Sequence, residues 1–383
     1  MNIAIVSAYY PPHMGGVETF AHNLARTLAS SGHAVTVITS KLDNDPPRES
    51  FDDGVQIFRL PTWNLLHSRF PLLKPRFLHS NASSDLRQLN LDAVIVNTRF
   101  YPLSRYGARL AHHLGLTSII IEHGSSHLTI GNAFADRCIR AYEHFATAII
   151  KRFRPRFFGV SNEALEWLEH FGIEGEGIFH NAIDAESFVH QSSHRNFRKE
   201  LGIPADDTVV AFTGRIVSEK GIWILAKVAE EFYERGARFH FLVAGDGPEL
   251  VGFASTCDEQ PNMHVLGRLS RPDVAALLLD ADAFCFPSSY PEGLPTSLLE
   301  AAACGTYIVV SKVGGALEIV PSCDYGTVVN ETNPHAFVSA LLDYDADQDS
   351  CTLRARACRE RVLREFSWEK TAEAVLKAIQ QDC

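Results

Sequence analysis

The sequence has few of the features that mark disulfide-bonded or zinc-bound proteins. It holds 8 cysteines in 383 residues, but none of them form a C-x-x-C pair and their spacing is irregular. Zinc ribbons and the disulfide frameworks of small secreted domains both depend on regular cysteine spacing. Neither is expected here, and a reducing cytosol is the simplest environment for these thiols.

Long apolar runs are missing as well. No run reaches the about 18 residues that a membrane-spanning helix requires. The N-terminal residues Met1–Val6 lack a basic segment and are soon followed by Pro11-Pro12, which is not the pattern of a signal peptide. We therefore expect a cytoplasmic protein whose contact with a membrane, at its inner face, is at most peripheral.

Common nucleotide, nucleophile and metal motifs are also absent. There is no G-x-G-x-x-G fingerprint, P-loop or G-x-S-x-G elbow, which disfavours a nicotinamide-dependent dehydrogenase. Asp280-Ala281-Asp282 matches D-x-D in letters, but it precedes an apolar strand-like run instead of following one. No histidine or cysteine spacing typical of zinc appears, so the sequence predicts neither a metal nor a cofactor.

Charge is divided unevenly along the chain. Residues 1–180 contain 17 Lys and Arg against 16 Asp and Glu, a net charge of +1, which leaves 18 against 30, a net charge of −12, for the remainder. An acidic second half argues against nucleic-acid binding. Residues 1–180 also hold 12 of the 17 histidines, and the two halves are expected to face different partners.

Short β-branched runs alternate with amphipathic stretches, a pattern that predicts an α/β fold with doubly wound parallel sheets. The first half contains predicted strands at Ile3–Val6, Val35–Thr39, Val55–Leu60, Ala93–Val96, Ser118–Ile121 and Phe157–Val160, and helices at Val17–Ser31 and Glu163–Phe171. The second half contains predicted strands at Thr208–Phe212, Phe239–Ala244, Ala283–Phe286 and Tyr307–Val310, and helices at Ile222–Arg235, Pro272–Leu279 and Thr296–Cys304.

The restart of this pattern near Asn181–Asp184 predicts two Rossmann-like domains with a cleft between them. We assign residues 1–183 to the first domain and 184–365 to the second. Residues 366–383 contain the amphipathic stretch Trp368–Ile379, which no strand follows. They are predicted to form a helix that packs back toward the first domain. Residues 40–54 and 186–198 are polar and are expected to be loops.

The segment 291–300, PEGLPTSLLE, is the most informative in the chain. Pro295 suits the first turn of a helix, whose free N–H groups and dipole bind phosphate. Glu292 precedes this anion site, and Glu300 lies about one turn inside the helix. A carboxylate on each side of a diphosphate site indicates an enzyme that acts on a nucleotide-linked substrate.

Two other loops carry similar chemistry, although each can also be interpreted as an ordinary turn or solvated loop. Gly15-Gly16 follow the first strand and let the backbone approach a ligand closely. The loop 214–221 follows the first strand of the second domain and brings Arg215 and Lys220 to the carboxyl end of the sheet, where both can reach an anion.

Three further sites are less specific. Asp246 lies in the loop Gly245–Glu249, which in isolation is a turn. His123 ends a buried strand before Gly124 and can point into the cleft, with His127 as a competing candidate and a structural role as the alternative. Asn181 at the domain junction either lines the cleft or forms a turn.

Together these segments resemble the retaining glycosyltransferases of family 4, also called glycosyl transferases group 1, which have the GT-B fold. The order and spacing of four elements carry the resemblance: Pro-Pro-x-x-Gly-Gly, Gly214-Arg215 with Lys220-Gly221, Gly245–Pro248, and the pair Glu292 and Glu300. The resemblance covers most of the chain, although residues 40–120 are not distinctive.

The resemblance implies a UDP- or GDP-sugar as donor, held mainly by the second domain. Arg215 and Lys220 would bind the diphosphate, Glu300 the ribose hydroxyls, and Glu292 and His123 would lie at the donor sugar. Backbone N–H groups would complete the phosphate cradle, and Leu266 would lie near the base. The other implied donor-binding positions are Gly15, Gly16, Asn181, Asp246, Gly293, Leu294 and Thr296.

The implied reaction is transfer of a hexose to an acceptor hydroxyl without a metal. Fixed cations would stabilise the departing diphosphate as its charge grows. Retention by front-face attack and retention through a covalent intermediate both stay open. A sugar-nucleotide epimerase and a non-catalytic sugar-nucleotide-binding protein are the alternatives, and the two-glutamate element disfavours the epimerase.

The acceptor side has two basic stretches in which cations alternate with apolar residues, at 69–77 and 151–157. Such mixtures suit an anionic membrane surface, although an ordinary solvated loop has the same composition. The resemblance implies a lipid-linked or glycan acceptor in cell-surface polysaccharide or glycolipid synthesis.

Overall fold

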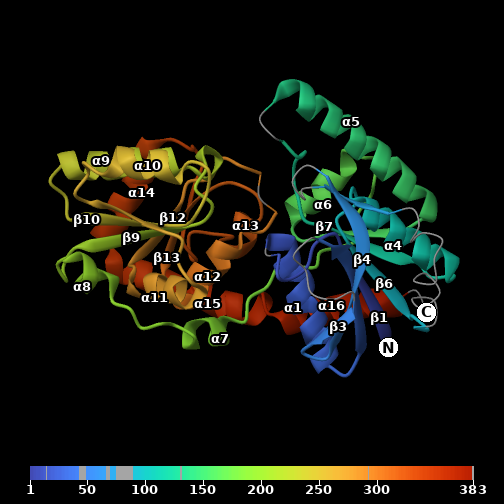
Figure 1. The fold of residues 1–383 in the computed structure, drawn as a ribbon. Helices are drawn as coiled ribbons and strands as arrows, with labels where there is room; N and C mark the ends of the chain where they lie inside the picture. The colour runs from blue at the N-terminus through green and yellow to red at the C-terminus, as the bar shows by residue number, and fades with distance from the viewer. Residues whose placement is uncertain are drawn as a thin grey trace. The chain divides into compact units, whose positions relative to one another are not determined.

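The computed structural model describes residues 1–13, 15–42, 49–65, 70–74, 89–129, 132–291 and 293–381. Its contacts divide the chain into two compact units. The N-terminal unit consists of Met1–Asn181 together with Trp368–Cys383, and the C-terminal unit of Ala182–Ser367. Each unit is built around its own sheet (Figure 1).

The sheet of the N-terminal unit has the strand order β3-β4-β2-β1-β6-β7-β8, with β5 paired to β4. Strands β1, β2, β4, β6, β7 and β8 run parallel to one another, whereas β3 and β5 are antiparallel to β4. Continuous burial of β6 and β7 explains their apolar runs, since helices cover both faces. The strands are β1 (Asn2–Ser7), β2 (Ala34–Lys41), β3 (Glu49–Asp52), β4 (Val55–Leu65), β5 (Phe70–Leu73), β6 (Ala93–Asn97), β7 (Ser118–Glu122) and β8 (Arg156–Gly159).

Helices α4 (Pro102–His113), α5 (Ala133–Ile150) and α6 (Asn162–Glu169) cover one face of this sheet. Helix α1 (Gly16–Ser30) packs against α16 (Trp368–Gln380). The ring of Trp368 meets Phe20 of α1 at 5.6 Å between centroids, and Arg156 Nη1 donates to the carbonyl of Ala378 at 2.6 Å. The last helix of the chain is therefore part of the N-terminal unit.

The sheet of the C-terminal unit has the order β11-β10-β9-β12-β13-β14, and every pair is parallel. The chain adds strands outward from β9 to β11 and then returns to place β12, β13 and β14 on the other side of β9. This order is that of a doubly wound sheet. The strands are β9 (Thr208–Thr213), β10 (Phe239–Ala244), β11 (Met263–Gly267), β12 (Ala283–Phe286), β13 (Tyr307–Ser311) and β14 (Thr327–Val329).

Helices cover both faces of this second sheet (Figure 1). Figure 1 shows α9 (Ile222–Glu234), α10 (Leu250–Cys257) and α14 (Pro334–Ala346) on one face, and α11 (Arg271–Asp280), α12 (Thr296–Cys304) and α15 (Gln348–Glu365) on the other. Buried residues of the strands and of all six helices form one hydrophobic core. The short helix α13 (Ala316–Ile319) follows β13.

Several elements differ from the sequence-based expectation. The polar stretch 186–198 is not a loop, because it contains most of α7 (Ala185–His190) and the start of α8 (Phe197–Leu201). Phe188 and Phe197 anchor these short helices in the core. Helices α4, α5, α10, α14 and α15 and strands β11 and β14 were not predicted either. Much of 40–54 lies outside the described residues, and β3 occupies part of the rest.

The alternating predicted strands are confirmed to within two residues at each end, apart from β4, which runs five residues further. Asp280 ends α11 and Asp282 directly precedes β12, and Arg198 forms ion pairs with both. In addition, the backbone N–H of Val209 donates to Asp282 Oδ2 at 2.7 Å. These contacts give both aspartates of the D-x-D sequence a structural role.

Candidate functional site

Loops that leave the carboxyl ends of β9, β10 and β12 are bonded to one another in the C-terminal unit. The N–H of Ile216 donates to the carbonyl of Asp246 at 2.9 Å, and the N–H of Ser289 donates to the carbonyl of Glu219 at 2.9 Å. Parallel sheets bind ligands at this edge. The three loops therefore form one connected rim at the edge where a ligand is expected.

Two glycines permit this close approach of backbones. A Cβ at Gly245 would collide with the carbonyl oxygen of Gly214, and a Cβ at Gly221 would collide with that of Pro287. Gly221 also has a φ of 77°, in the left-handed region that favours glycine. In this rim the glycines are required by loop-to-loop packing, whatever else they contact.

Glu249 braces the loop between β9 and α9, and the sequence alone did not single it out for this role. Its carboxylate accepts from the N–H of Ser218 at 2.6 Å, from Ser218 Oγ at 2.6 Å and from Trp223 Nε1 at 2.8 Å. The Ser218 and Trp223 hydrogen bonds hold the pKa of Glu249 below its ordinary value. An ionised brace thus fixes the loop that carries Arg215 and Lys220.

The two predicted phosphate-binding cations lie in this braced loop. Arg215 is exposed, and Lys220 ends the short 3₁₀ turn Ser218–Lys220 immediately before α9. Lys220 Nζ lies 5.5 Å from the centre of the Phe286 ring, at the end of β12. Lys220 is thereby placed beside the strand that leads into the segment 291–300.

Helix α12 begins at Thr296, as the sequence predicts, with Pro295 in an extended conformation as its N-cap. No side chain among the described residues caps it, whereas Ser270 caps α11 and Asn333 caps α14. Helix α9 also starts without a side-chain cap, after Gly221. Uncapped N–H groups at a sheet edge suit an anionic ligand.

Residues just before α12 are held by the chain that follows β13. The N–H of Gly315 donates to the carbonyl of Gly293 at 2.7 Å, and Leu294 is buried. A Cβ at Gly315 would press on Leu294. Glu292, one of the two predicted glutamates, lies outside the described residues, so its predicted role stays a prediction.

Glu300 lies one turn into α12 and is only partly exposed. Burial raises its pKa from 4.5 to about 7, and the positive charge of Arg271 opposes this shift. Near neutral pH such a carboxyl changes between its neutral and charged forms. In its charged form the carboxylate accepts hydrogen bonds from hydroxyl groups more strongly than in its neutral form.

The two remaining predicted positions of the C-terminal unit lie in the loop after β10 and on the neighbouring strand β11. Asp246 is exposed at the end of β10, where its Oδ1 accepts from the N–H of Gly247 at 2.8 Å. Leu266 is partly exposed in β11, next to Gly267, whose carbonyl accepts from the N–H of Gly245 at 2.8 Å. Both positions belong to the same rim.

In the N-terminal unit, His123 directly follows β7 and its ring packs edge-on against Phe20 at 4.8 Å. Its Nε2 lies 2.8 Å from Asn97 Oδ1, an acceptor, so Nε2 carries the hydrogen and Nδ1 keeps its lone pair. Burial lowers the pKa of His123 from 6.5 to about 3. His123 is therefore a neutral hydrogen-bonding group at physiological pH.

A buried ionic network behind His123 was not foreseen. Arg99 is 2% exposed and forms ion pairs with Glu122 and Glu143, and its guanidinium lies 3.8 Å above the centre of the Phe171 ring. Glu122 Oε1 in turn accepts from the N–H groups of His123 and Gly124, both at 3.1 Å. The network fixes the turn that presents His123.

Gly15 and Gly16 lie where α1 begins, with Gly15 as an extended N-cap that has no side-chain cap bond. A Cβ at Gly15 would collide with the carboxylate of Glu18, which is 7% exposed and whose pKa is raised by burial. Asn181 is buried at the end of the N-terminal unit. Glu18, like Glu249, is a carboxylate that the sequence alone did not single out.

The basic stretches differ in how far the structure explains them. Lys151 Nζ donates to the carbonyls of Phe171 and Gly172, and Arg156 pairs with Glu176 at 2.6 Å. Arg152 and Arg154 are exposed. Much of the stretch 69–77 lies outside the described residues. No helix within the described ranges is long and apolar enough to cross a membrane.

Comparison with known families agrees with the fold. The family model described as "Glycosyltransferase Family 4" matches residues 14–214, more than half of the chain, and "Glycosyl transferases group 1" matches residues 193–361. The chain belongs to glycosyltransferase family 4, and its two Rossmann-like units are those of the GT-B fold. It is a glycosyltransferase.

Its relatives include several proteins of lipid glycosylation. An uncharacterized glycosyltransferase of Methanocaldococcus jannaschii is 25% identical over 391 residues, covering 97% of this chain and 96% of its own. The GPI3 subunit of the phosphatidylinositol N-acetylglucosaminyltransferase of Saccharomyces cerevisiae is 24% identical over 84% of this chain and 70% of its own. The alpha-monoglucosyldiacylglycerol synthase of Acholeplasma laidlawii is 26% identical over 81% and 80%.

Solved structures share the fold over almost the whole chain. Sucrose-phosphate synthase from Thermosynechococcus elongatus superposes with a TM-score of 0.78 at 20% identity, covering 99% of this chain and 98% of its own. The Anabaena protein HepE in complex with UDP-glucose gives a TM-score of 0.73 at 16% identity, with both chains covered fully at 100%.

Proposed function

We propose that this glycosyltransferase retains anomeric configuration while moving a hexose from a UDP-sugar to a lipid-linked acceptor, without a metal. The observation that carries the proposal is the rim of the C-terminal unit. There the braced loop with Arg215 and Lys220 is bonded to the segment leading to the uncapped start of α12. Cations and free N–H groups together suit a diphosphate.

The rim supplies the electrostatics that the reaction needs. Breaking the bond between sugar and diphosphate places negative charge on the leaving group. Arg215, Lys220 and the N–H groups of α12 would stabilise this charge more as it grows, which lowers the barrier. Gly293 and Leu294 would add their backbone N–H groups beside it. The UDP-glucose complex of HepE supports UDP-sugars as the first donors to test.

Groups of the N-terminal unit would serve the donor sugar and the acceptor. His123 is neutral and its Nε2 hydrogen is donated to Asn97, so its Nδ1 would accept a hydrogen bond from a sugar hydroxyl. Its fixed orientation, braced by Glu122, favours a positioning contact over general-base catalysis. Front-face attack of the acceptor is favoured for the retaining reaction, because it requires no side chain to act as a nucleophile.

A membrane acceptor is supported by one surface of the N-terminal unit. On α5, Phe134 and Phe145 are 79% and 65% exposed, and Arg137 and Arg140 are exposed between them. Aromatic side chains beside arginines suit an anionic lipid surface. Relatives named for phosphatidylinositol and diacylglycerol glycosylation support the same kind of acceptor.

The donor is tested by incubating the full chain with UDP-, GDP- and ADP-sugars, with and without vesicles of mixed phospholipid and diacylglycerol. We expect a UDP-sugar to raise the Tm and a lipid glycoside with retained configuration to form in the presence of chelator. Interconversion of the nucleotide sugar without acceptor would instead identify an epimerase. Binding without any product from a broad acceptor panel would identify a binding protein.

Membrane contact is tested by sedimentation with vesicles of anionic phospholipid. Replacing Phe134 and Phe145 by Ser should release most of the protein from the pellet, whereas Leu353→Ser should not. Leu353 is a suitable control because it is 68% exposed but lies on α15 of the C-terminal unit. Equal pelleting of all variants would contradict this part of the proposal.

A further inference from the structure

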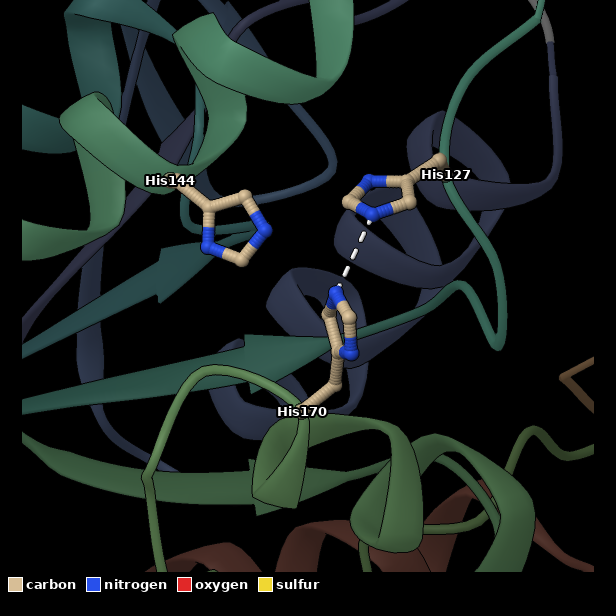
Figure 2. A group of neighbouring side chains, drawn as sticks. All are labelled: His127, His144 and His170. Atoms are coloured by element: carbon tan, nitrogen blue, oxygen red, sulfur yellow. Dashed lines mark hydrogen bonds between the residues drawn. The ribbon is translucent and has the colours of Figure 1, made fainter.

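Three histidines of the N-terminal unit come together although they are far apart in the sequence. His127 lies in the segment between β7 and α5, His144 lies on α5, and His170 directly follows α6. Figure 2 shows the three rings turned toward a common space. His127 is half-buried, and His144 and His170 are exposed.

The spacing of the ring nitrogens is close to that of a metal site. His127 Nε2 and His170 Nε2 are 3.2 Å apart, and one ligand atom from each histidine lies within 4.8 Å of the others. Two nitrogens bound tetrahedrally to zinc at about 2.0–2.1 Å are separated by about 3.3 Å. The first pair already has this separation, and the ligand atom of the exposed His144 lies within 4.8 Å of both.

A buried carboxylate holds His127 in the form that a metal needs. His127 Nδ1 lies 3.1 Å from Glu143 Oε2, so Nδ1 carries the hydrogen and Nε2 presents its lone pair to the cluster. Glu143 is itself fixed by Arg99 at 3.1 Å and by the N–H of Leu128 at 2.9 Å. A carboxylate behind a metal-bound histidine orients the ring and makes it a better ligand.

Neutral imidazole is the metal-binding form of histidine, and packing holds the His170 ring beside the cluster. The ring of His170 stacks on Trp167 with 4.8 Å between centroids. Three clustered imidazoles repel one another when protonated, and a bound cation replaces that repulsion with coordination.

We propose that His127, His144 and His170 bind one Zn²⁺ ion, with a water molecule in the fourth position. Three imidazoles with an open fourth position are a known zinc arrangement. The ion would join the segment after β7 to α5 and α6. That segment begins at His123, so zinc would stiffen the chain that leads away from the proposed sugar contact. The metal is not a participant in glycosyl transfer.

A second histidine pair provides a matched control. In the C-terminal unit, His240 Nδ1 and His264 Nε2 are also 3.2 Å apart, and His240 Nε2 lies 3.1 Å from Asp207 Oδ2. The described residues around this pair supply no third histidine to the group. His240 lies between a carboxylate and a histidine as His127 does, so the pair differs from the cluster in having no third histidine.

The test is zinc titration of the full chain after removal of metals with a chelator, using a chromophoric competitor. The wild-type chain should bind one equivalent with a dissociation constant in the micromolar range or below. His144→Ala and His170→Ala should each weaken binding about a hundredfold or more, and His264→Ala should leave it unchanged. Both substituted cluster positions are exposed, so folding, checked by circular dichroism, should persist.

Cobalt provides the independent measurement, because Co²⁺ in a tetrahedral nitrogen site absorbs visible light strongly. Wild type and His264→Ala should give this absorption with one equivalent of Co²⁺, and His144→Ala should not. The proposal is overturned if wild type binds no zinc in this range, or if the His264 variant, and not the cluster variants, loses the ion. Neither measurement depends on glycosyl transfer.

Discussion

At the scale of single residues, Lys220 is the side chain on which the proposed leaving-group stabilisation depends most. Its ammonium group lies beside Phe286 at the end of β12, in the loop braced by Glu249. Lys220→Ala should lower the transfer rate more than tenfold, because a charge-assisted contact to the diphosphate contributes about 1.5–3 kcal/mol. The measurement is kcat with saturating donor.

Lys227→Ala is the matched control for this prediction. Lys227 is an exposed lysine on α9, one element away from Lys220. Its loss changes net charge equally without touching the rim, so turnover should stay near that of the wild type. If both variants lose activity alike, or neither does, the assignment of Lys220 fails.

Glu300 makes a prediction about pH. Burial raises its pKa from 4.5 to about 7, so the folded state holds a proton that the unfolded state has already released. Stability due to this group is thus fully present below pH 4.5 and is lost as pH rises toward 7. Glu300→Gln removes that loss. Its Tm relative to wild type should therefore rise between pH 5 and pH 8, as measured by scanning fluorimetry.

The same variant separates stability from donor binding. If Glu300 holds ribose hydroxyls, the Gln variant should be the more stable protein at pH 8 and yet show a smaller Tm increase with UDP. Glu230→Gln, at an exposed position on α9, should change neither quantity. A pH-independent difference in Tm would show that burial does not control this carboxyl.

At the scale of elements, the start of α12 can be tested through a single N–H group. Thr296 is the first residue of the helix, where proline is tolerated, and Pro295 before it is already extended. Thr296→Pro removes the N–H and Thr296→Ala keeps it. The proline variant should bind donor about tenfold or more weakly, as expected for a lost charged hydrogen bond.

Isothermal titration with UDP measures this difference directly. Thr296→Ala should bind within about twofold of the wild type, since Thr296 is exposed and its side chain forms no cap. Equal weakening in both variants would point to the hydroxyl instead of the backbone. Equal and unchanged binding would remove α12 from the phosphate site.

The space around two glycines of the C-terminal unit predicts opposite effects on stability when each is replaced by alanine. A Cβ at Gly245 would collide with the backbone of Gly214, so Gly245→Ala should lower the free energy of unfolding by about 1–3 kcal/mol. A Cβ at Gly252 of α10 meets nothing within 4 Å, and Gly252→Ala should stabilise by about 0.5–1 kcal/mol. Urea denaturation measures both, and a stable Gly245→Ala variant would refute the packing argument.

At the scale of the whole molecule, the chain returns to the N-terminal unit after completing the C-terminal one. Helix α16 contacts α1, and Thr371 Oγ1 donates to the carbonyl of His180 at 2.8 Å. A chain ending at Ser367 should therefore lose stability in the N-terminal unit only. Removing α16 exposes the surface of α1 around Phe20, which the Trp368 ring contacts in the full chain.

Hydrogen–deuterium exchange resolves the two units of the truncated chain. Amides of α1 should exchange much faster than in the full chain, whereas those of α9 should be unchanged. The strands β9 and β10 serve as internal reference because they lie in the core of the C-terminal unit. Faster exchange of both units together would mean that the units unfold cooperatively.

Sequence patterns determined much of this protein. Each predicted strand and helix is marked by the pattern of a few neighbouring residues. The same is true of the segments 214–221, 245–249 and 291–300. The periodicity of a buried strand and the chemistry of a helix start both arise locally, so they can be recognised without a structure. The family and the two sheets followed from them.

Only the tertiary structure decided which distant groups meet. It joined Arg99 to Glu122 and Glu143 across the N-terminal unit, and it raised the pKa of Glu300 by burial. It also placed His127 beside His170, 43 positions away, where sequence spacing predicted no metal ligands. Burial and long-range contact depend on how whole elements pack, and no local pattern contains that information.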